Sequence, residues 1–288
     1  MRAAEPLDLL HLGRERVIAS YLLDTPADGP ALFDCGPATC AETLKQRLAE
    51  RGLALTDIRH LLLSHIHLDH AGAAGVLVRE HPTLTVHVSE IGAPHLVDPS
   101  RLERSARRLY GDDFERLWGE LAPVPERNVQ VVADRVLGLE CFPSPGHASH
   151  HVSYLDAGGT LYAGDAAGVR IAPSAFVLPP TPPPEFDLER WLSTVDELER
   201  RRPTRLALIH FGTADDVETH LAELRERLQT WTADVERGAD EAAFMAGRET
   251  EMAALPEEQR GSYDQAIPFW QSYAGIKRYI DKRRERAA

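Results

Sequence analysis

Four potential metal ligands fall within residues 65–70, which read HIHLDH and follow an apolar LLL run after a single serine. Imidazole and carboxylate groups bind zinc, iron and manganese, and hydrolytic enzymes use these metals to make hydroxide near neutral pH. If the segment leaves a buried strand as a turn, His65 and His67 lie on one face and can share one metal. Asp69 and His70 then face a second metal beside it. The cluster therefore predicts a metal site at a strand end rather than a polar surface loop.

Three further ligand-type residues each follow a short stretch with the composition of a strand or a tight turn. His147 comes after PSPG, Asp165 after LYAG and His210 after LALI. A side chain at a strand end can be aimed at a fixed point, although each of these residues alone is often only a turn residue. Together with residues 65–70, they indicate one site with seven histidine and aspartate side chains.

Short apolar runs alternate with helical stretches over residues 1–213. Strands are predicted at 16–23, 31–34, 58–64, 84–88, 129–133, 137–142, 152–156, 160–163 and 205–209. Helices are predicted at 40–51, 188–201 and over most of 101–121, turns at 26–29 and 158–159, and a proline-rich irregular loop at 173–184. Strands that alternate with helices twice over predict two similar sheet-plus-helix halves packed face to face.

Residues 214–288 read as a separate, highly charged helical extension. Its aromatic residues cluster at Phe269, Trp270, Tyr273 and Tyr279. We expect this cluster to lie mainly in the core, with the lining of a substrate pocket or a dimer contact as the alternatives. The extension also leaves a homodimer open.

The formal net charge of -13 argues against a nucleic-acid partner. Four arginines, at 101, 104, 107 and 108, fall at helical spacings, with Arg116 further on, and we favour a solvated helix face over a basic patch. There is no apolar stretch of membrane-spanning length and no signal-peptide pattern, so we expect a cytoplasmic location without a membrane partner. The three cysteines form no CxxC pair, and reduced, buried thiols are expected.

The order HxHxDH, a histidine in a PGH turn, an aspartate after glycine and a late strand-end histidine resembles the metallo-β-lactamase superfamily of hydrolases. The resemblance runs from about residue 16 to residue 212. It implies an α/β (α+β) fold, a four-layer αββα sandwich over residues 1–213, with the metals in a groove at one edge of two sheets.

The resemblance also implies the roles of the seven residues. One divalent metal is expected on His65, His67 and His147, and a second on Asp69, His70 and His210, with Asp165 bridging both. The implied nucleophile is a hydroxide between the two metals, and Asp69 and Asp165 are the catalytic carboxylates, with Asp69 able to accept a proton from the water. Zinc is expected first, with manganese or iron as alternatives.

Two residues beside the ligands also match the family pattern. Asp34 and Gly36 stand in its early Asp-x-Gly, where Gly36 serves the turn and Asp34 orients a ligand imidazole. His151 is expected to pack behind a ligand or to hydrogen-bond to it. The remaining histidines, at 11, 60, 81, 87, 95, 150 and 220, are expected to be ordinary surface or core residues.

The residues around the motifs select no subfamily. Asp165 stands where some β-lactamases of the family carry a cysteine, and Gly168 where acyl-homoserine lactonases carry a tyrosine. Ser174 and Phe176 replace the glutathione-contacting lysine and tyrosine of glyoxalase II. We expect hydrolysis of an ester-like bond, thioester or lactone first, in a small metabolite, with Phe176 as a candidate for substrate contact. The alternatives are a phosphodiester or phosphotriester hydrolase, a one-iron oxidoreductase resembling persulfide dioxygenases, and an inactive scaffold.

Overall fold

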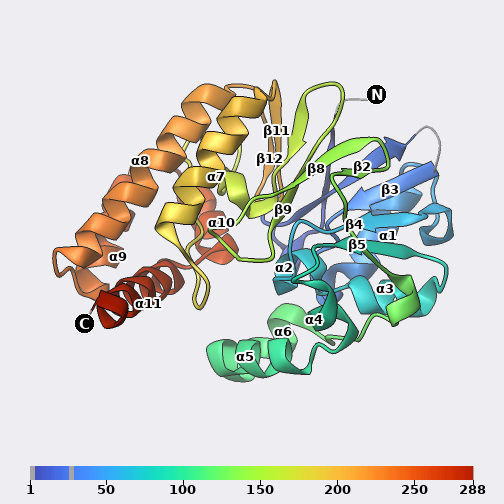
Figure 1. Cartoon of the computed structure of the whole chain (residues 1–288), viewed down its shortest axis with the longest axis horizontal. Helices are drawn as coiled ribbons and strands as arrows, with labels where there is room; N and C mark the ends of the chain where they lie inside the picture. The colour runs from blue at the N-terminus through green and yellow to red at the C-terminus, as the bar shows by residue number, and fades with distance from the viewer. Residues whose placement is uncertain (1–3, 26–28, 288) are drawn as a thin grey trace.

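Two six-stranded β-sheets pack against each other in this computed structural model, which describes residues 4–25 and 29–287 (Figure 1). The first sheet has the order β1 (Pro6–Asp8), β2 (Ala19–Thr25), β3 (Gly29–Phe33), β4 (His60–Leu62), β5 (Thr85–Val88) and β6 (Val129–Val131). The second has the order β12 (Gly212–Ala214), β11 (Arg205–Leu208), β10 (Thr160–Tyr162), β9 (Val152–Leu155), β8 (Leu139–Pro143) and β7 (Arg135–Val136). Strands β3 to β6 run parallel, and the inner strands β4 and β5 are largely buried, as is usual in a parallel sheet.

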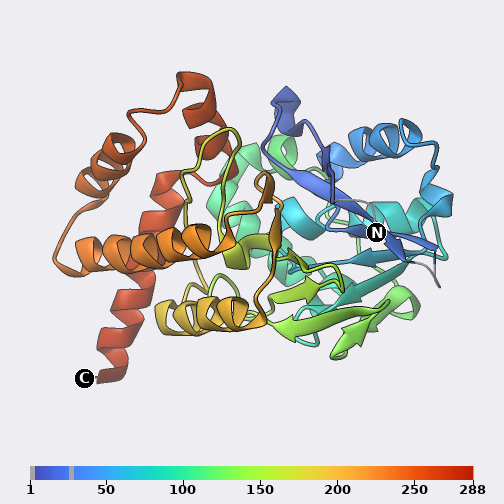
Figure 2. The ribbon, with the colours of Figure 1, turned by 90° about the horizontal axis from the view of Figure 1, so that it is seen from above.

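Helices surround the two sheets and confirm the predicted α/β sandwich. They are α1 (Ala41–Ala49), α2 (Leu68–Ala71), α3 (Ala74–Glu80), α4 (Ala93–Val97), α5 (Ser100–Tyr110), α6 (Phe114–Trp118), α7 (Leu188–Arg201), α8 (Val217–Glu236), α9 (Glu241–Glu251), α10 (Glu257–Ala266) and α11 (Phe269–Ala287). Helices α1 and α3 flank the first sheet, whereas α7 and α8 lie on the side of the second (Figures 1 and 2). No described helix has the length and apolar composition needed to cross a membrane.

Buried tyrosines connect the two sheets near the edge where the ligand-bearing loops leave them. The hydroxyl group of Tyr21 in β2 lies 2.8 Å from the carbonyl oxygens of both Leu208 and Gly212, which share its single O–H donor. From the second sheet, the hydroxyl group of Tyr154 donates to the carbonyl oxygen of Leu63 at 3.0 Å. Because all three acceptors lie in loops or at strand ends next to predicted ligands, these bonds fix the two halves of the site relative to each other.

The structure differs from the predicted elements mainly at their ends. The first predicted strand, β2, begins at Ala19 rather than at residue 16, because Arg16 has a left-handed backbone with φ of 60°. The stretch 101–121 divides into α5 and α6, joined by a 3₁₀ turn that starts at Gly111, where φ is 54°. Strands β1, β7 and β12 have only two or three residues and were not predicted. The predicted turn at 26–29 lies outside the described residues except for Gly29.

The C-terminal helices share one buried apolar cluster with the sheets. The hydroxyl group of Tyr263 in α10 donates to Phe176 O (2.6 Å) and accepts from Ile171 N–H (2.9 Å). Gly275 of α11 touches the same loop so closely that a Cβ atom there would lie 1.9 Å from Thr181 O. These helices therefore support the loop over residues 171–186, while a domain boundary near residue 214 stays a prediction.

Candidate metal centre

The HIHLDH segment passes from β4 into the short helix α2, so its side chains point in two directions. His67 precedes the helix with an extended backbone, whereas Asp69 and His70 lie inside it. The Val152 N–H group of β9 donates to Ser64 O at 2.8 Å, which holds this segment against the second sheet. The strand-to-helix turn is therefore the local reason why one motif serves two groups of side chains.

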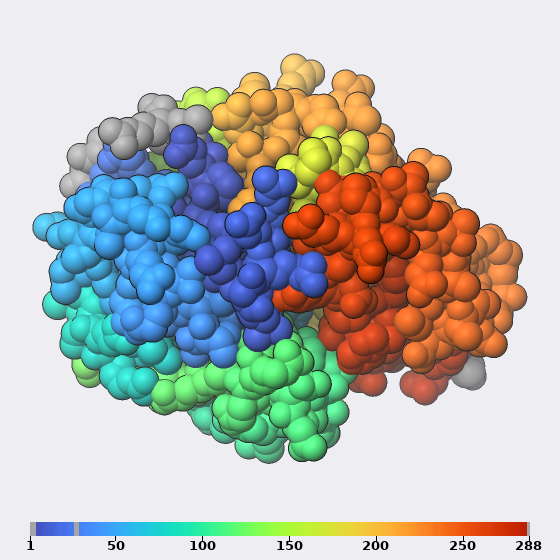
Figure 3. Space-filling model, turned by 180° about the vertical axis from the view of Figure 1, so that it is seen from behind, coloured from blue at the N-terminus to red at the C-terminus, as the bar shows by residue number. Residues whose placement is uncertain are grey.

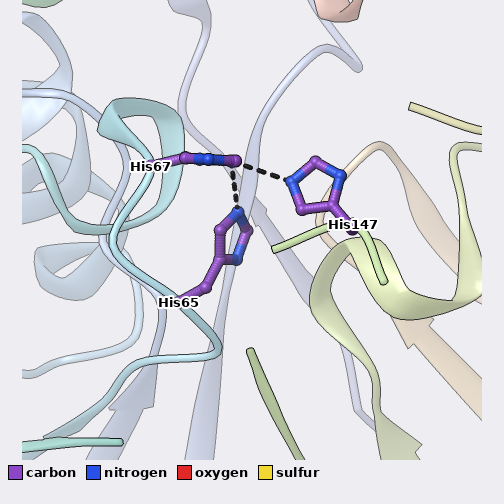
Figure 4. A group of neighbouring side chains, drawn as sticks. All are labelled: His65, His67 and His147. Atoms are coloured by element: carbon purple, nitrogen blue, oxygen red, sulfur yellow. Dashed lines mark hydrogen bonds between the residues drawn. The ribbon is translucent and has the colours of Figure 1, made fainter. Parts of the chain in front are cut away.

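Three histidines form the first group (Figure 4). His67 Nδ1 lies 3.0 Å from His65 Nε2 and 2.8 Å from His147 Nε2. Two nitrogens bound to one metal at about 2.0–2.1 Å are separated by about 3 Å, depending on the bond angle. The three nitrogens are therefore spaced as the ligands of one metal would be.

The second group consists of Asp69, His70 and His210. Asp69 Oδ2 lies 3.2 Å from His210 Nε2 and 3.6 Å from His70 Nε2. Asp165 stands between the two groups, because its Oδ2 lies 3.3 Å from His147 Nε2 and its Oδ1 lies 3.3 Å from His70 Nε2. His70 Nε2 and Asp165 Oδ1 are buried without a hydrogen-bond partner among the described residues. A cation would satisfy both atoms.

The outer nitrogens of four histidines are held by acceptors, and this fixes their tautomers. The Nδ1–H groups of His147 and His210 donate to the carbonyl oxygens of Pro180 (2.8 Å) and Val17 (2.6 Å). His70 Nδ1 lies 2.8 Å from Asp34 Oδ2. A carbonyl or carboxylate oxygen can only accept, so each Nδ1 carries the proton and each Nε2 keeps a free lone pair.

Ser64 completes this outer layer. Its hydroxyl group donates to Asp34 Oδ2 at 2.7 Å, so its oxygen is free to accept from His65 Nδ1–H at 2.9 Å. The nitrogen atoms of His65, His70, His147 and His210 that point to the centre are thereby all Nε2, while His67 presents Nδ1.

The electrostatics of the site favour the protonation states that metal ligands require. Burial lowers the pKa of His65 and His147, and lowers that of His67 to about 4. Burial alone would raise the pKa values of Asp69 and Asp165, but the neighbouring imidazoles, His70 first, hold both below the usual range. Three imidazoles are thus neutral, and both carboxylates are ionised.

The remaining two imidazoles respond to these carboxylates. Burial lowers the pKa of His70 and of His210, yet the adjacent Asp165 and Asp69 outweigh it and raise both values. The second group therefore attracts positive charge, and a dication bound there would take the place of protons.

The two predicted supporting residues lie against the ligands. Asp34, fully buried, contacts His70 as described, and its φ of 51° belongs to the turn that ends at Gly36. A side chain at Gly36 would place a Cβ atom 2.5 Å from Leu9, so the tight turn requires glycine. His151 stacks on His65 with ring centroids 4.8 Å apart, and its Nε2 accepts from the Asp165 N–H group at 3.2 Å.

A pocket of about 1170 Å³ lies over this centre. Five of the seven predicted ligands line it: His67, Asp69, His147, Asp165 and His210. Along one side, the N-terminal segment, α5–α6 and the C-terminal helices meet (Figure 3). His11 joins them, because its Nε2–H group donates to Leu117 O at 2.9 Å and its carbonyl oxygen accepts from Gln265 at 2.7 Å.

The lining of the pocket contradicts two of the expectations and agrees with a third. Phe176 does not line it, because its ring packs under Tyr263 and Arg227. The aromatic cluster of the C-terminal helices is absent from the lining, and Phe269 and Tyr279 are core residues, which agrees with the location that we expected first. The arginines at 101, 108 and 116 do line the pocket, although the sequence favoured a solvated helix face.

His150, which the sequence does not mark as a site residue, lines the pocket beside the first group. Its ring lies parallel to that of His65, with centroids 5.9 Å apart, and its Nε2 lies 3.7 Å from Glu185 Oε2. The motif gave no reason to single it out, since it lies next to the better matched His151.

This chain is similar to one sequence relative and two solved structures over most of their length. "Probable metallo-hydrolase YqjP" of Bacillus subtilis (strain 168) is 25% identical over 250 residues, which cover 76% of this chain and 75% of that protein. The superfamily protein ST1585 of Sulfolobus tokodaii matches with a TM-score of 0.67 and 18% identity, over 95% of this chain and 97% of its own. TTHA1429 of Thermus thermophilus matches with a TM-score of 0.65 and 24% identity, over 94% of this chain and 89% of its own.

A family model described as "Metallo-beta-lactamase superfamily" matches residues 13–210. This range contains every residue of the two ligand groups and both sheets apart from β1 and β12. The chain therefore belongs to the metallo-beta-lactamase superfamily.

Proposed function

We propose that this protein is a dinuclear metal-dependent hydrolase that cleaves an ester-like bond, thioester or lactone first, in a small metabolite. The position of Asp165 carries the proposal, since each of its oxygens faces a different histidine group at 3.3 Å. A carboxylate placed in this way can hold two adjacent metals, which is the arrangement of two-metal hydrolases.

The seven side chains fit two divalent metals. His65, His67 and His147 would hold one, and Asp69, His70 and His210 the other, with Asp165 shared. Metals bound there would lower the pKa of water and polarise the oxygen of the scissile bond. Two dications against two carboxylates leave the centre positively charged, which suits an anionic transition state. Imidazole and carboxylate ligands suit zinc first, with manganese or iron as alternatives.

Asp69 is placed to move a proton. Its side chain is 17% exposed and lines the pocket, whereas that of Asp165 is 5% exposed. Asp69 keeps one oxygen on His210, so the other is free to accept a proton from water in the pocket. His147 and His210 are held by backbone carbonyls and only bind and orient.

The pocket supports a small-molecule substrate. Its volume of about 1170 Å³ is slightly larger than the usual range of about 300–1,000 Å³ for small-molecule sites, and Leu68, Leu102 and Trp118 give it apolar walls. We therefore place the acyl part of an ester or thioester against these side chains, with its carbonyl carbon over the ligand groups.

A substrate panel tests the proposal. Purified protein loaded with zinc, manganese or iron is assayed with thioesters, lactones and phosphodiesters, and its metal content is measured in parallel. Turnover of an acyl compound with two metals per chain supports the proposal. Phosphodiester turnover with no acyl turnover would overturn the acyl preference. One iron per chain with oxygen uptake would favour an oxidoreductase instead.

A further inference from the structure

Arginine side chains that the proposed hydrolysis does not use surround the pocket. They come from the N-terminal segment, α5–α6 and α11, and they are Arg14, Arg101, Arg108, Arg116 and Arg278. Apart from the predicted metal ligands, the acidic residues of the lining are Glu185 and Asp264. The pocket thus carries an excess of positive charge in a chain whose net charge is -13.

Three of these arginines are not neutralised by any other residue that the structure describes. Arg101, Arg108 and Arg278 make no ion pair or hydrogen bond with any residue in 4–25 or 29–287, and all three are exposed. Arg107 of the same helix behaves differently, since Glu103 (2.8 Å) and Glu115 (2.6 Å) neutralise it outside the pocket.

The face of α5 that borders the pocket therefore differs from its outer face. Arg101 and Arg108 are seven residues apart, which places them on one side of the helix, with Leu102, Ser105 and Leu109 also in the pocket lining. Arg278 reaches the same pocket from α11. The apolar wall and the unpaired guanidinium groups therefore line the same pocket, which suits a ligand with an apolar body and an anionic group.

We propose that the substrate is an amphiphilic ester or thioester whose carboxylate or phosphate group binds Arg101, Arg108 and Arg278 while its reacting bond lies over the metal groups. The hydrolytic part rests on the proposed function, whereas the anion site stands on the arginines alone. Guanidinium groups pair with carboxylate and phosphate oxygens through two parallel N–H donors, so either anion fits.

Kinetics with a matched pair of substrates test the proposal. Metal-loaded protein is assayed with a thioester of a six-carbon diacid whose far end is a free carboxylate, and with the same thioester capped as a methyl ester. We expect kcat/KM to favour the charged thioester by about tenfold or more. The Arg101→Ala/Arg108→Ala double variant should lose this preference, mainly through KM.

Arg104→Ala is the matched control, because it removes an exposed charge from the same helix outside the pocket. It should keep the preference. Equal kcat/KM for both thioesters in the unmodified protein, or an unchanged preference in the double variant, would overturn the proposal.

Calorimetric binding separates the anion site from the reaction. Hexyl phosphate, hexanoate and hexanol are titrated into the metal-loaded protein and into the double variant. We expect the anions to bind at least about tenfold more tightly than hexanol, and the double variant to lose that advantage. The anion whose affinity falls more in the double variant carries the group that the site prefers. Anions also bind metals directly, so equal anion affinities in the unmodified protein and the double variant would refute the arginine site. Failed turnover of both thioesters would refute only the hydrolase.

Discussion

Replacing Asp34 by asparagine tests how the outer layer of the site controls the inner one. Asp34 Oδ1 accepts from Ser64 N–H at 2.7 Å, and Oδ2 accepts from the Ser64 hydroxyl (2.7 Å) and from His70 Nδ1–H (2.8 Å). Asparagine has the same size and tolerates the left-handed backbone at this position, so the fold should survive. Its amide NH₂ group, however, would face His70 Nδ1 as a donor.

The consequence follows from the two tautomers of histidine. His70 Nδ1 would have to accept, so its proton would move to Nε2, the atom that faces Asp69 and Asp165 at 3.6 and 3.3 Å. A protonated Nε2 cannot bind a metal. One charge-assisted hydrogen bond of about 1.5–3 kcal/mol is lost, which corresponds to about 10–100-fold in metal affinity. The loss should be larger for the second group than for the first, because the amide contacts His70 directly and reaches His65 only through the Ser64 hydroxyl.

Chelator competition and metal analysis measure this effect. The Asp34→Asn protein should keep one tightly bound metal per chain and bind the other about 10–100-fold more weakly, with a melting curve close to that of the unmodified protein. Asp34→Ala is the comparison that removes all three bonds, and it should also destabilise the fold. Two metals bound at unchanged affinity in Asp34→Asn would refute the tautomer argument.

Three further changes follow from other contacts. Asp165→Asn should reduce metal content and hydrolysis together, hydrolysis by more than about 100-fold, and full activity with two metals would exclude the shared carboxylate. Burial lowers the pKa of His220 to about 4. Between about pH 6.5 and 4, this histidine is therefore protonated in the unfolded chain but neutral in the folded one. Stability should therefore fall by up to about 3 kcal/mol between pH 6.5 and 4 in urea unfolding, and less steeply in His220→Gln. Gly275→Ala would press a Cβ atom against Thr181 O, beside the carbonyl that holds His147. The free energy of unfolding in denaturant should fall by about 1–3 kcal/mol, and metal binding should weaken. Unchanged values of both would show that the loop moves without cost.

The sequence predicts the core of the site because its ligands sit at strand ends. His147, Asp165 and His210 each follow a short strand or turn, and the packing of two sheets brings such ends to one edge. The spacing inside HIHLDH works for a similar reason, since a strand-to-helix turn divides it into two directions. Features of this kind depend on residues that are close in the sequence, so they can be predicted without knowing the packing of the whole chain.

Asp34 and His151 are predicted as partners of the ligands, but the backbone groups that hold His147 and His210 are not. Val17 and Pro180 act through carbonyl oxygens, which every residue possesses, so no residue type marks them. Arg101 and Arg108 were assigned to a solvated face because helical spacing shows which residues share a face, not what that face meets. Phe176 was misplaced because its environment is made by Tyr263, far along the chain.

Anomalous diffraction from crystals of the zinc-loaded protein tests the two-metal centre most directly. We predict two peaks per chain, one within about 2.0–2.3 Å of His65 Nε2, His67 Nδ1 and His147 Nε2, the other equally close to ligand atoms of Asp69, His70 and His210. One oxygen of Asp165 should lie within bonding distance of each peak. A single peak in an active protein, or an Asp165 that reaches only one metal, would contradict the dinuclear centre.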